Sequence, residues 1–368
     1  MRTKNAARLS GVRDTFHKLG IFGRGAWRYW RFGEPAPESN YIVQKLYAFT
    51  DGRSNDFLFR ILESKRRETS PAFPWRGPSL LSASAVLDST NEDPTIEPSV
   101  CALRQDGVVV LPRRLPQEAI QNLYGLARSC SLNTTTYATP SAGSADAQPT
   151  TPIADLGTSN GIDPFHPRYA VYTVPREILL ENYYLQCLLC DPYLLTIATR
   201  YLGVFPVVTK PDMWWDTDCV PAGLRPRPFH VDSGCLRWLK VGINLTDTTF
   251  DAPHFVYVKG SHNPNRTTRP LTRRLTSRMN LSDREVHDVC SDKVVHFTAP
   301  AGSITLADTR GIHKGELAAH GHRLILYFGL EGSAFNNIDK PIPLNKVGCE
   351  LGQAMTAHPF SYQFFRAT

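Results

Sequence analysis

Three residues in the C-terminal half have the types and spacing of a metal site. His230 and Asp232 lie two positions apart in Pro-Phe-His-Val-Asp-Ser, and alternate side chains of an extended segment point to the same face. His313 follows much later, in Asp-Thr-Arg-Gly-Ile-His. Two histidines and one carboxylate on one octahedral face leave three positions open, as in non-haem iron(II) oxygenases. We therefore predict that His230, Asp232 and His313 are the metal ligands and the catalytic centre.

Arg323 stands ten residues after His313, at the start of the apolar run Leu324 to Leu330. A permanent charge in such a run is costly unless an anion pairs with it. A planar guanidinium can hold the far carboxylate of a dicarboxylic acid through two hydrogen bonds. The sequence thus predicts Arg323 as the residue that binds a dicarboxylate cosubstrate.

These motifs, in this order, resemble the phytanoyl-CoA dioxygenase family of Fe(II)/2-oxoglutarate-dependent oxygenases. The resemblance covers roughly residues 101 to 332 and rests on Asp106-Gly-Val-Val-Val-Leu-Pro, Phe229-His-Val-Asp, Tyr257-Val-Lys-Gly-Ser-His and the segment from Asp308 to Arg323. It implies a double-stranded β-helix (jelly-roll) core, Fe(II) as the metal, and 2-oxoglutarate and O2 as cosubstrates. By the same resemblance, Arg323 would hold the C5 carboxylate of 2-oxoglutarate. The carboxylate of Asp232 disfavours halogenation, because related halogenases carry a small residue at this position.

The activity implied by the resemblance is hydroxylation of an unactivated C-H bond in a small or medium-sized metabolite of a biosynthetic pathway, with release of succinate and CO2. Desaturation or cyclisation by the same chemistry is one alternative, and a non-catalytic jelly-roll binding protein is another. A nucleic-acid oxygenase is disfavoured because the catalytic half lacks interleaved basic and aromatic recognition motifs. We therefore expect a small-molecule substrate and no nucleic-acid partner.

Basic residues gather around these motifs: Arg266, Arg269, Arg273, Arg274 and Arg278 before His313, and Arg225, Arg227, Arg237 and Lys240 beside the first ligands. Around a pocket mouth they would favour an anionic or carrier-linked substrate. A solvated basic face is the alternative. We name Arg237 and Trp215 as candidate substrate contacts, with a core position as the alternative for Trp215.

The elements that must position these residues follow from the pattern of apolar residues. Short β-branched and aromatic runs, expected as strands, occupy residues 204–209, 239–245, 254–258, 294–297, 303–306 and 324–330. Helical spacing marks residues 55–67, 117–131 and 176–201, while the Ser/Thr/Gly-rich stretch 134–161 is expected to be a surface loop, with a mobile lid as the alternative. The pattern predicts a mainly β fold with flanking helices (α+β) around a jelly-roll core.

Three regions are expected along the chain. Residues 1–95 form a basic, partly helical N-terminal extension with a Ser/Pro-rich linker, residues 96–335 form the dioxygenase domain, and residues 336–368 pack on its core. Residues 1 to 33 hold eight basic residues and one acid, and end in a cluster of aromatic residues. This segment could contact an anionic membrane surface, act as an organelle transit peptide, or be a solvated arm that docks on the catalytic domain.

The composition limits the class of protein. Hydrophobic residues make up 42% and charged residues 20% of the 368 residues, which suits a globular protein with a sizeable core. The formal charge of +7 suits anionic partners without naming one. Eight cysteines without a dense framework predict reduced thiols, and Cys187-x-x-Cys190 is expected to be buried rather than redox-active. These features favour a cytoplasmic location, with organelle targeting as the alternative.

Overall fold

The computed structural model describes residues 2–50, 52–69, 78–81, 93–137, 152–219, 227–232, 234–264, 267–278, 280–317, 320–338 and 340–368. Most of the predicted Ser/Pro-rich linker and the middle of the 134–161 stretch lie outside these ranges. Arg225 and Arg266 also lie outside the described residues.

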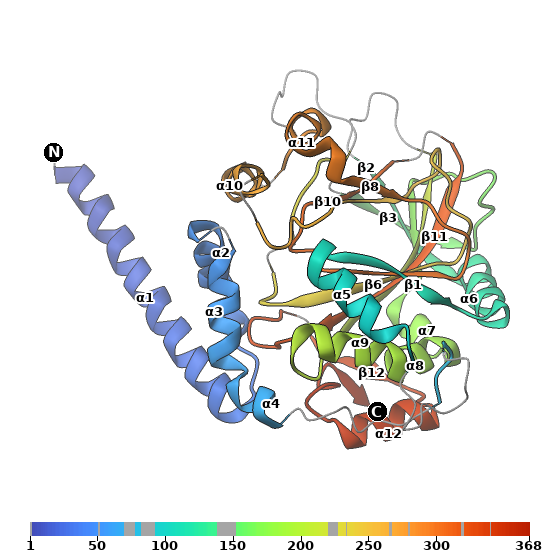
Figure 1. Ribbon diagram of the computed structural model, residues 1–368, viewed down its shortest axis with the longest axis horizontal. Coiled ribbons are helices and arrows are strands. Elements are labelled where there is room, and N and C mark those ends of the chain that lie inside the picture. The colour runs from blue at the N-terminus through green and yellow to red at the C-terminus, as the bar shows by residue number, and fades with distance from the viewer. Residues whose placement is uncertain are drawn as a thin grey trace.

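An antiparallel sheet of eight strands forms the larger of two facing layers (Figure 1). Its order is β1-β9-β6-β11-β5-β4-β2-β3. The strands are β1 (Val108–Arg114), β2 (Ser131–Tyr137), β3 (Pro152–Asn160), β4 (Val171–Thr173), β5 (Val207–Thr217), β6 (Trp238–Asn244), β9 (Ser303–Ala307) and β11 (His322–Glu331).

A smaller antiparallel sheet faces the large one and contains β10 (His313–Gly315), β7 (Phe255–Val258) and β8 (Val294–Phe297), in that order. The segment around His230 extends this sheet, because His230 bridges to His313 at the β10 edge. The core strands therefore alternate between two facing sheets along the chain. This arrangement confirms the predicted jelly-roll core with flanking helices.

Strand alternation gives each sheet an apolar outer face and an inner face toward the other sheet. On β11, Leu324, Leu326 and Phe328 join the main hydrophobic core beneath the helices, whereas Ile325 and Tyr327 line a cavity between the sheets. Helices that contribute to this main core are α5 (Ile96–Asp106), α6 (Gln117–Ser129), α7 (Arg176–Leu180), α8 (Tyr183–Leu189), α9 (Pro192–Leu202) and α12 (Cys349–Ala357). A second core packs the small sheet against α10 (Arg269–Arg278) and α11 (Asp283–Cys290), with η2 (Ser291–Lys293) following.

Two expectations about elements are corrected. The predicted helix 176–201 is three helices, because the side chains of Asn182 and Asp191 each accept backbone hydrogen bonds at a new helix start, and Pro192 follows at the first helical position. The 134–161 stretch is not a loop at its described ends, which belong to the paired strands β2 and β3. Threonine-rich sequence hides this pairing because threonine suits both strands and loops.

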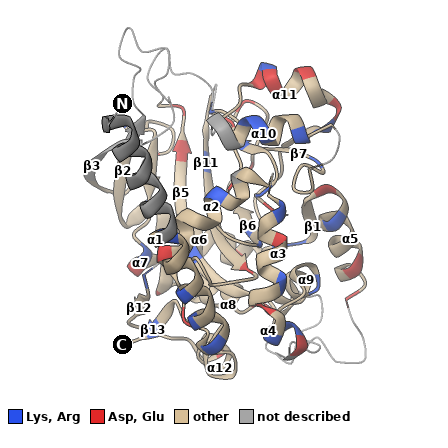
Figure 2. Ribbon diagram, turned by 90° about the vertical axis from the view of Figure 1, so that its left-hand side faces the viewer, with Lys and Arg blue, Asp and Glu red and all other residues tan. Residues whose placement is uncertain are grey.

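The N-terminal region is more helical than expected. It contains α1 (Arg2–Phe32), η1 (Pro37–Ser39), α2 (Asn40–Phe49), α3 (Arg53–Leu62) and α4 (Ser64–Thr69). In Figure 1, α1 is the outermost element and runs beside α2 and α3 toward α4, and in Figure 2 the side that carries α1 faces the viewer. Among the described helices, none is long and apolar enough to cross a membrane.

The C-terminal segment returns to the main core. Strands β12 (Ile342–Leu344) and β13 (Phe365–Ala367) form a parallel pair. Tyr362 is buried and donates a 3.1 Å hydrogen bond to the carbonyl of Leu189 in α8. The last residues thus cover the helical layer.

Candidate metal centre

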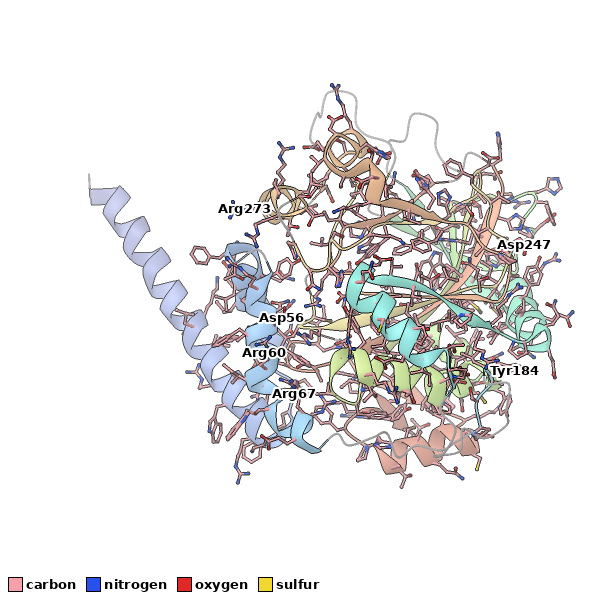
Figure 3. The ribbon with its side chains drawn as sticks, in the orientation of Figure 1. Asp56, Arg60, Arg67, Tyr184, Asp247 and Arg273 are labelled. Carbon is pink, nitrogen blue, oxygen red and sulfur yellow. The ribbon has the colours of Figure 1, made fainter. Side chains whose placement is uncertain are left out.

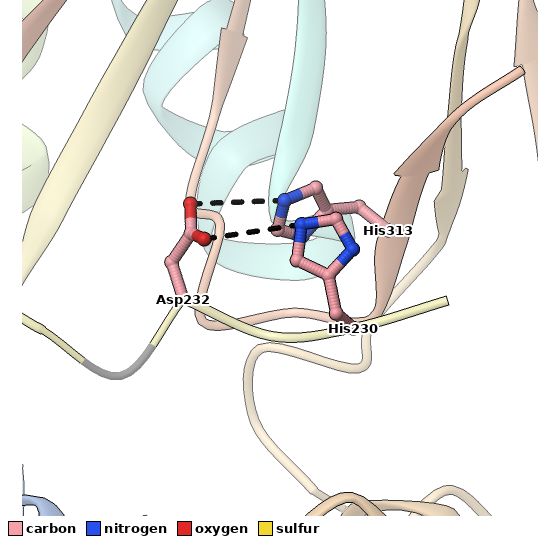
Figure 4. A group of neighbouring side chains, drawn as sticks. All are labelled: His230, Asp232 and His313. Carbon is pink, nitrogen blue, oxygen red and sulfur yellow. Dashed lines mark ion pairs between the residues drawn. The ribbon is translucent and has the colours of Figure 1, made fainter. Parts of the chain in front are cut away.

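His230, Asp232 and His313 converge at one point between the sheets (Figure 4). One potential ligand atom from each lies within 4.8 Å of the other two. The Nε2 atoms of His230 and His313 lie 4.0 Å and 3.7 Å from the carboxylate oxygens of Asp232. Among the described residues, this is the group of three that could hold a metal ion in this way.

Backbone hydrogen bonds fix the three ligands relative to one another. His230 and His313 exchange both N-H to carbonyl bonds, each 2.9 Å long, although they are far apart in sequence. The amide of Asp232 donates a 2.8 Å bond to the carbonyl of Thr309. The ladder geometry of the small sheet therefore brings the distant histidine to the His-x-Asp pair.

The hydrogen bonds of the imidazoles favour metal binding through Nε2. His313 Nδ1 lies 2.9 Å from the carbonyl of Gly311, and His230 Nδ1 lies 3.3 Å from the carbonyl of Pro228. A carbonyl can only accept, so each Nδ1 donates its proton to that carbonyl and Nε2 is the nitrogen that remains to face the common point. This second bond is the usual means of orienting a metal-binding histidine.

Burial and local charges keep His313 and Asp232 deprotonated. Burial would raise the pKa of Asp232, but Lys240 and the two histidines lower it well below its usual value. Burial lowers the pKa of His313 to about 3, with a further contribution from His230. A cation therefore meets a carboxylate and a neutral imidazole, which are the protonation states that metal coordination requires.

Lys240 is the nearest cation to the ligands, with Nζ 3.2 Å from Asp232. Burial would lower the pKa of Lys240, but the neighbouring Asp232 raises it above its usual value. The sequence names Lys240 only as one of several basic flanking residues. Lys240 is the third residue of β6 and points to the inward face. Because side chains alternate along a strand, this orientation can be predicted once the strand boundary is known.

A cavity adjoins this group between the two sheets. It is lined by Lys240, Gly242, Asn244, Phe255, Phe297, Thr305, Ala307, Thr309, Ile325 and Tyr327. Two of these residues contact Asp232, Lys240 through its ammonium and Thr309 through its carbonyl. The mixed polar and aromatic lining is typical of sites for small ligands.

Arg323 lies on the inward face of β11, in alternation with Ile325 and Tyr327. Its side chain is 3% exposed, and Nη2 donates a 2.7 Å bond to Asp216 on the neighbouring strand β5. Sequence reasoning expects an external anion to balance this charge, whereas Asp216 already balances it within the protein. Arg323 Nε has no hydrogen-bond partner within the described part of the chain.

Arg227 shares the same carboxylate, because its Nη2 donates a 3.1 Å bond to the other oxygen of Asp216. Burial, together with the positive charge of the neighbouring Arg323, lowers the pKa of Arg227 to about 10. Two guanidinium groups and one carboxylate leave a net positive charge in a largely buried place. Asp216 was not predicted, since its role depends on the register between β5 and β11.

The two candidate substrate contacts lie elsewhere. Trp215 is fully buried on the other face of β5, where its Nε1 donates a 3.0 Å bond to Ala127 in α6. This placement does not support a substrate role for Trp215 and matches the alternative of a core position. The preceding residue, Trp214, points to the opposite face of β5, and its ring stacks on that of Tyr327 with ring centres 4.8 Å apart.

Arg237 is held by the N-terminal region. Its Nε donates a 2.8 Å bond to Asp56, and its guanidinium lies 4.7 Å from the ring centre of Phe59. Both partners belong to α3, so the structure gives Arg237 a role in docking this helix. The expected substrate contact is not supported by this position.

Asp56 connects α3 to both segments that carry metal ligands (Figure 3). The same carboxylate oxygen that accepts from Arg237 accepts a 3.3 Å bond from Arg310, three residues before His313. Arg310 is buried and also binds Asp308 through three hydrogen bonds of 2.6 to 3.2 Å. Asn55 adds a 3.0 Å bond to the carbonyl of Cys235, just beyond Asp232.

The remaining predicted groups are placed as follows. The arginines at 269, 273 and 274 belong to α10, on the outer side of the small sheet, and the side chain of Arg278 lies outside the described ones. His254 and His296 contact each other at 2.8 Å rather than joining the three ligands. None of the eight cysteines, all of which lie in the described ranges, forms a disulfide, and burial raises the pKa of the Cys187 and Cys190 thiols, as expected for buried residues.

No protein-family model matches the chain, and a search of curated proteins finds no match. Among solved structures, the non-haem α-ketoglutarate dependent carbocyclase SnoK from nogalamycin biosynthesis is 19% identical, with a TM-score of 0.39 over 66% of this chain and 87% of the other. HygX from Streptomyces hygroscopicus, with nickel and 2-oxoglutarate bound, is 14% identical, with a TM-score of 0.41 over 69% and 92%. EctD from S. alaskensis with bound Fe is 17% identical, with a TM-score of 0.39 over 75% and 91%. Similarity at this level does not assign the chain to a family.

Proposed function

We propose that this protein is an Fe(II)- and 2-oxoglutarate-dependent dioxygenase. The observation that carries the proposal is the convergence of His230, Asp232 and His313 beside a cavity between the two sheets. The donor set fits iron(II), because both histidines direct Nε2 to the common point and the carboxylate remains ionised. With both bound, iron and 2-oxoglutarate would supply oxidation of a substrate C-H bond by O2, with release of succinate and CO2.

The protein's own residues would bind and orient the cosubstrate. Arg323 and Arg227 present two guanidinium groups around one carboxylate, and this excess positive charge favours an added carboxylate. Asp216 keeps both side chains in place before that carboxylate arrives. Lys240 adds a further cation on the cavity wall next to Asp232.

For the substrate we propose a small or medium-sized anionic metabolite, hydroxylated at an unactivated carbon, as in the phytanoyl-CoA dioxygenase family that the sequence resembles. The support is Lys240, a cation on the cavity wall beside Asp232. A hydroxylated product is the default outcome when the substrate radical lies close to the metal. Desaturation or cyclisation by the same residues would show as a product that contains no new oxygen.

The test is the anaerobic addition of Fe(II) and 2-oxoglutarate to the metal-free protein, followed by visible absorption spectroscopy. We expect a metal-to-ligand charge-transfer band in the wild type, its loss in His313→Ala, and a weaker affinity for 2-oxoglutarate in Arg323→Ala. His320→Ala, at an exposed position, is the matched control and should keep the band. A wild type that gives no band, and that never converts 2-oxoglutarate to succinate, would remove the proposal.

A further inference from the structure

Exposed apolar side chains are concentrated in the N-terminal helices. Of the fourteen large hydrophobic residues that are exposed in the described part of the chain, eight lie between residues 19 and 61. They are Leu19, Trp27, Trp30, Phe32, Tyr41, Phe49, Phe57 and Ile61. The remaining six are spread over the other three hundred or so residues, so this concentration is a property of one region.

Five of these residues lie on the outer helices α1 and α3. Trp27 and Phe32 are 60% and 59% exposed and contact each other edge to face, with ring centres 5.7 Å apart. Trp30 lies one helical turn from Trp27 and reaches the start of α4 through a 3.4 Å bond from Nε1 to Ser64. Phe57 and Ile61 follow at a spacing of four residues on α3, which places them on one side of that helix. We call these five residues the aromatic strip.

The aromatic strip is surrounded by positive charge. The ammonium of Lys65 lies 3.8 Å from the ring centre of Trp30, and Arg31 lies 5.6 Å from that of Phe32. Arg24, Arg31 and Arg60 are exposed on the same helices. The sequence of α1 contains eight basic residues and one acid, Asp14. Trp27, Trp30 and Phe32 are 60%, 40% and 59% exposed, and α1 is the outermost helix in Figure 1.

We propose that the aromatic strip and its arginines bind an anionic lipid surface, with α1 lying in the plane of the interface. Tryptophan and phenylalanine beside arginine and lysine are the composition of interfacial helices, in which the rings enter the headgroup region and the cations meet lipid phosphates. A second copy of this chain would bring one basic face against another, and like charges oppose that contact. None of the described helices can span a bilayer, so the contact is peripheral.

The experiment is sedimentation of the full chain with vesicles of phosphatidylcholine alone or with 30% phosphatidylserine, in about 0.1 M salt. We expect binding to the anionic vesicles only, with a blue shift of tryptophan emission. Trp27→Ser/Trp30→Ser should reduce binding at least tenfold. Arg24→Gln/Arg31→Gln/Arg60→Gln should reduce it by roughly fivefold per charge removed. The matched control is Phe165→Ser/Phe250→Ser, which removes two exposed rings elsewhere and should bind normally.

Three results would overturn the proposal. Wild-type protein that stays in solution with the anionic vesicles contradicts it directly. Binding that persists unchanged in both strip variants shows that another surface is responsible. Concentration-dependent dimerisation that Trp27→Ser/Trp30→Ser abolishes would assign the strip to a second copy instead. Circular dichroism and the unfolding midpoint of each variant separate a lost surface from a lost fold. Succinate production without vesicles is measured separately, so this test does not depend on the proposed chemistry.

Discussion

At the scale of single residues, the chemistry of the site depends on the protonation states of His313 and Asp232. His313 is buried, donates Nδ1-H to Gly311, and shares its surroundings with His230 and Lys240. Burial and the two neighbouring basic groups disfavour a second proton on its ring, and together they outweigh the opposite effects of Asp232 and of the bond to Gly311 on the pKa of His313. Asp232 is ionised for the opposite reason, because the same neighbours stabilise its negative charge.

The depressed pKa of His313 predicts a pH dependence of stability in the metal-free protein. Its folded pKa of about 3 lies below the ordinary value of 6.5, so the unfolded state takes up the proton first. The stability contributed by neutral His313 is therefore present above pH 6.5 and is lost as the pH falls from there toward 3. Between pH 7 and pH 5 the wild type should lose about 2 kcal/mol more than His313→Gln. Urea unfolding in the presence of a chelator measures this difference, and equal losses in the two proteins would contradict it.

Arg323→Met tests the cosubstrate role of the buried arginine. Loss of a charge-assisted contact should raise the KM for 2-oxoglutarate by about 10- to 100-fold. Arg176→Met is the matched control, because Arg176 binds Asp212 on the same strand β5 through bonds of 2.7 and 2.9 Å. If both variants raise the KM equally, the effect belongs to the strand and not to the site.

At the scale of elements, loop 308–312 places His313 and holds Asp232 through the carbonyl of Thr309. Gly311 permits this path because a Cβ atom there would lie 1.9 Å from Tyr257 Oη and 3.0 Å from Ser261 Oγ. Tyr257 is itself fixed by a 2.7 Å bond to the carbonyl of Asp308. Because these neighbours are fixed, the loop has little freedom to shift and make room for a side chain at position 311.

Gly311→Ala should consequently destabilise the protein by about 1 to 3 kcal/mol through overpacking. Gly125→Ala is the control, since a Cβ at Gly125 meets nothing within 4 Å in helix α6, where alanine is favoured over glycine. Urea denaturation of both variants is the measurement. A Gly311→Ala protein as stable as the wild type would show that the loop has room that the geometry does not indicate.

Helix α3 acts on the site through Asp56, which bonds to Arg237 after the first ligands and to Arg310 before the last. Asp56→Asn should weaken Fe(II) binding about tenfold, as is usual when support around metal ligands is removed. Asp93→Asn is the matched control. It removes the carboxylate that pairs with Arg113, and it should leave metal affinity unchanged. Metal titration monitored by the charge-transfer band compares the two. Equal affinities in both variants would limit Asp56 to a purely structural role.

At the scale of the whole molecule, the metal site joins segments that are distant in sequence across the small sheet. A metal that binds only the folded chain should stabilise it by about 2.7 kcal/mol at one hundred times its dissociation constant. Unfolding in urea with and without Fe(II), under anaerobic conditions, measures this gain. Asp232→Ala should abolish it, and a gain that survives this substitution would place the metal elsewhere.

The sequence by itself identified the residues whose chemistry is distinctive. A His-x-Asp pair has a period of two, so its side chains share a face in any extended segment. Local residue preference predicts strands at 239–245, 254–258, 294–297 and 303–306, and the structure has strands within one residue of each of these bounds. His313 and Arg323 could be identified because histidine and arginine are unusual residues beside apolar runs. These inferences depend on neighbours along the chain, which the sequence records directly.

The tertiary structure decided what depends on register and on long-range contact. Asp216 meets Arg323 only because β5 and β11 pair with Asp216 opposite that arginine, and Trp215 faces the helices because it is one residue out of phase. The contacts of Arg237 and Arg310 with Asp56 join residues separated by 181 and 254 positions. No local pattern specifies such pairings, since they arise from how the strands and the N-terminal helices pack. The three candidate ligands could thus be named from residue type, whereas the residues that hold them in place could not.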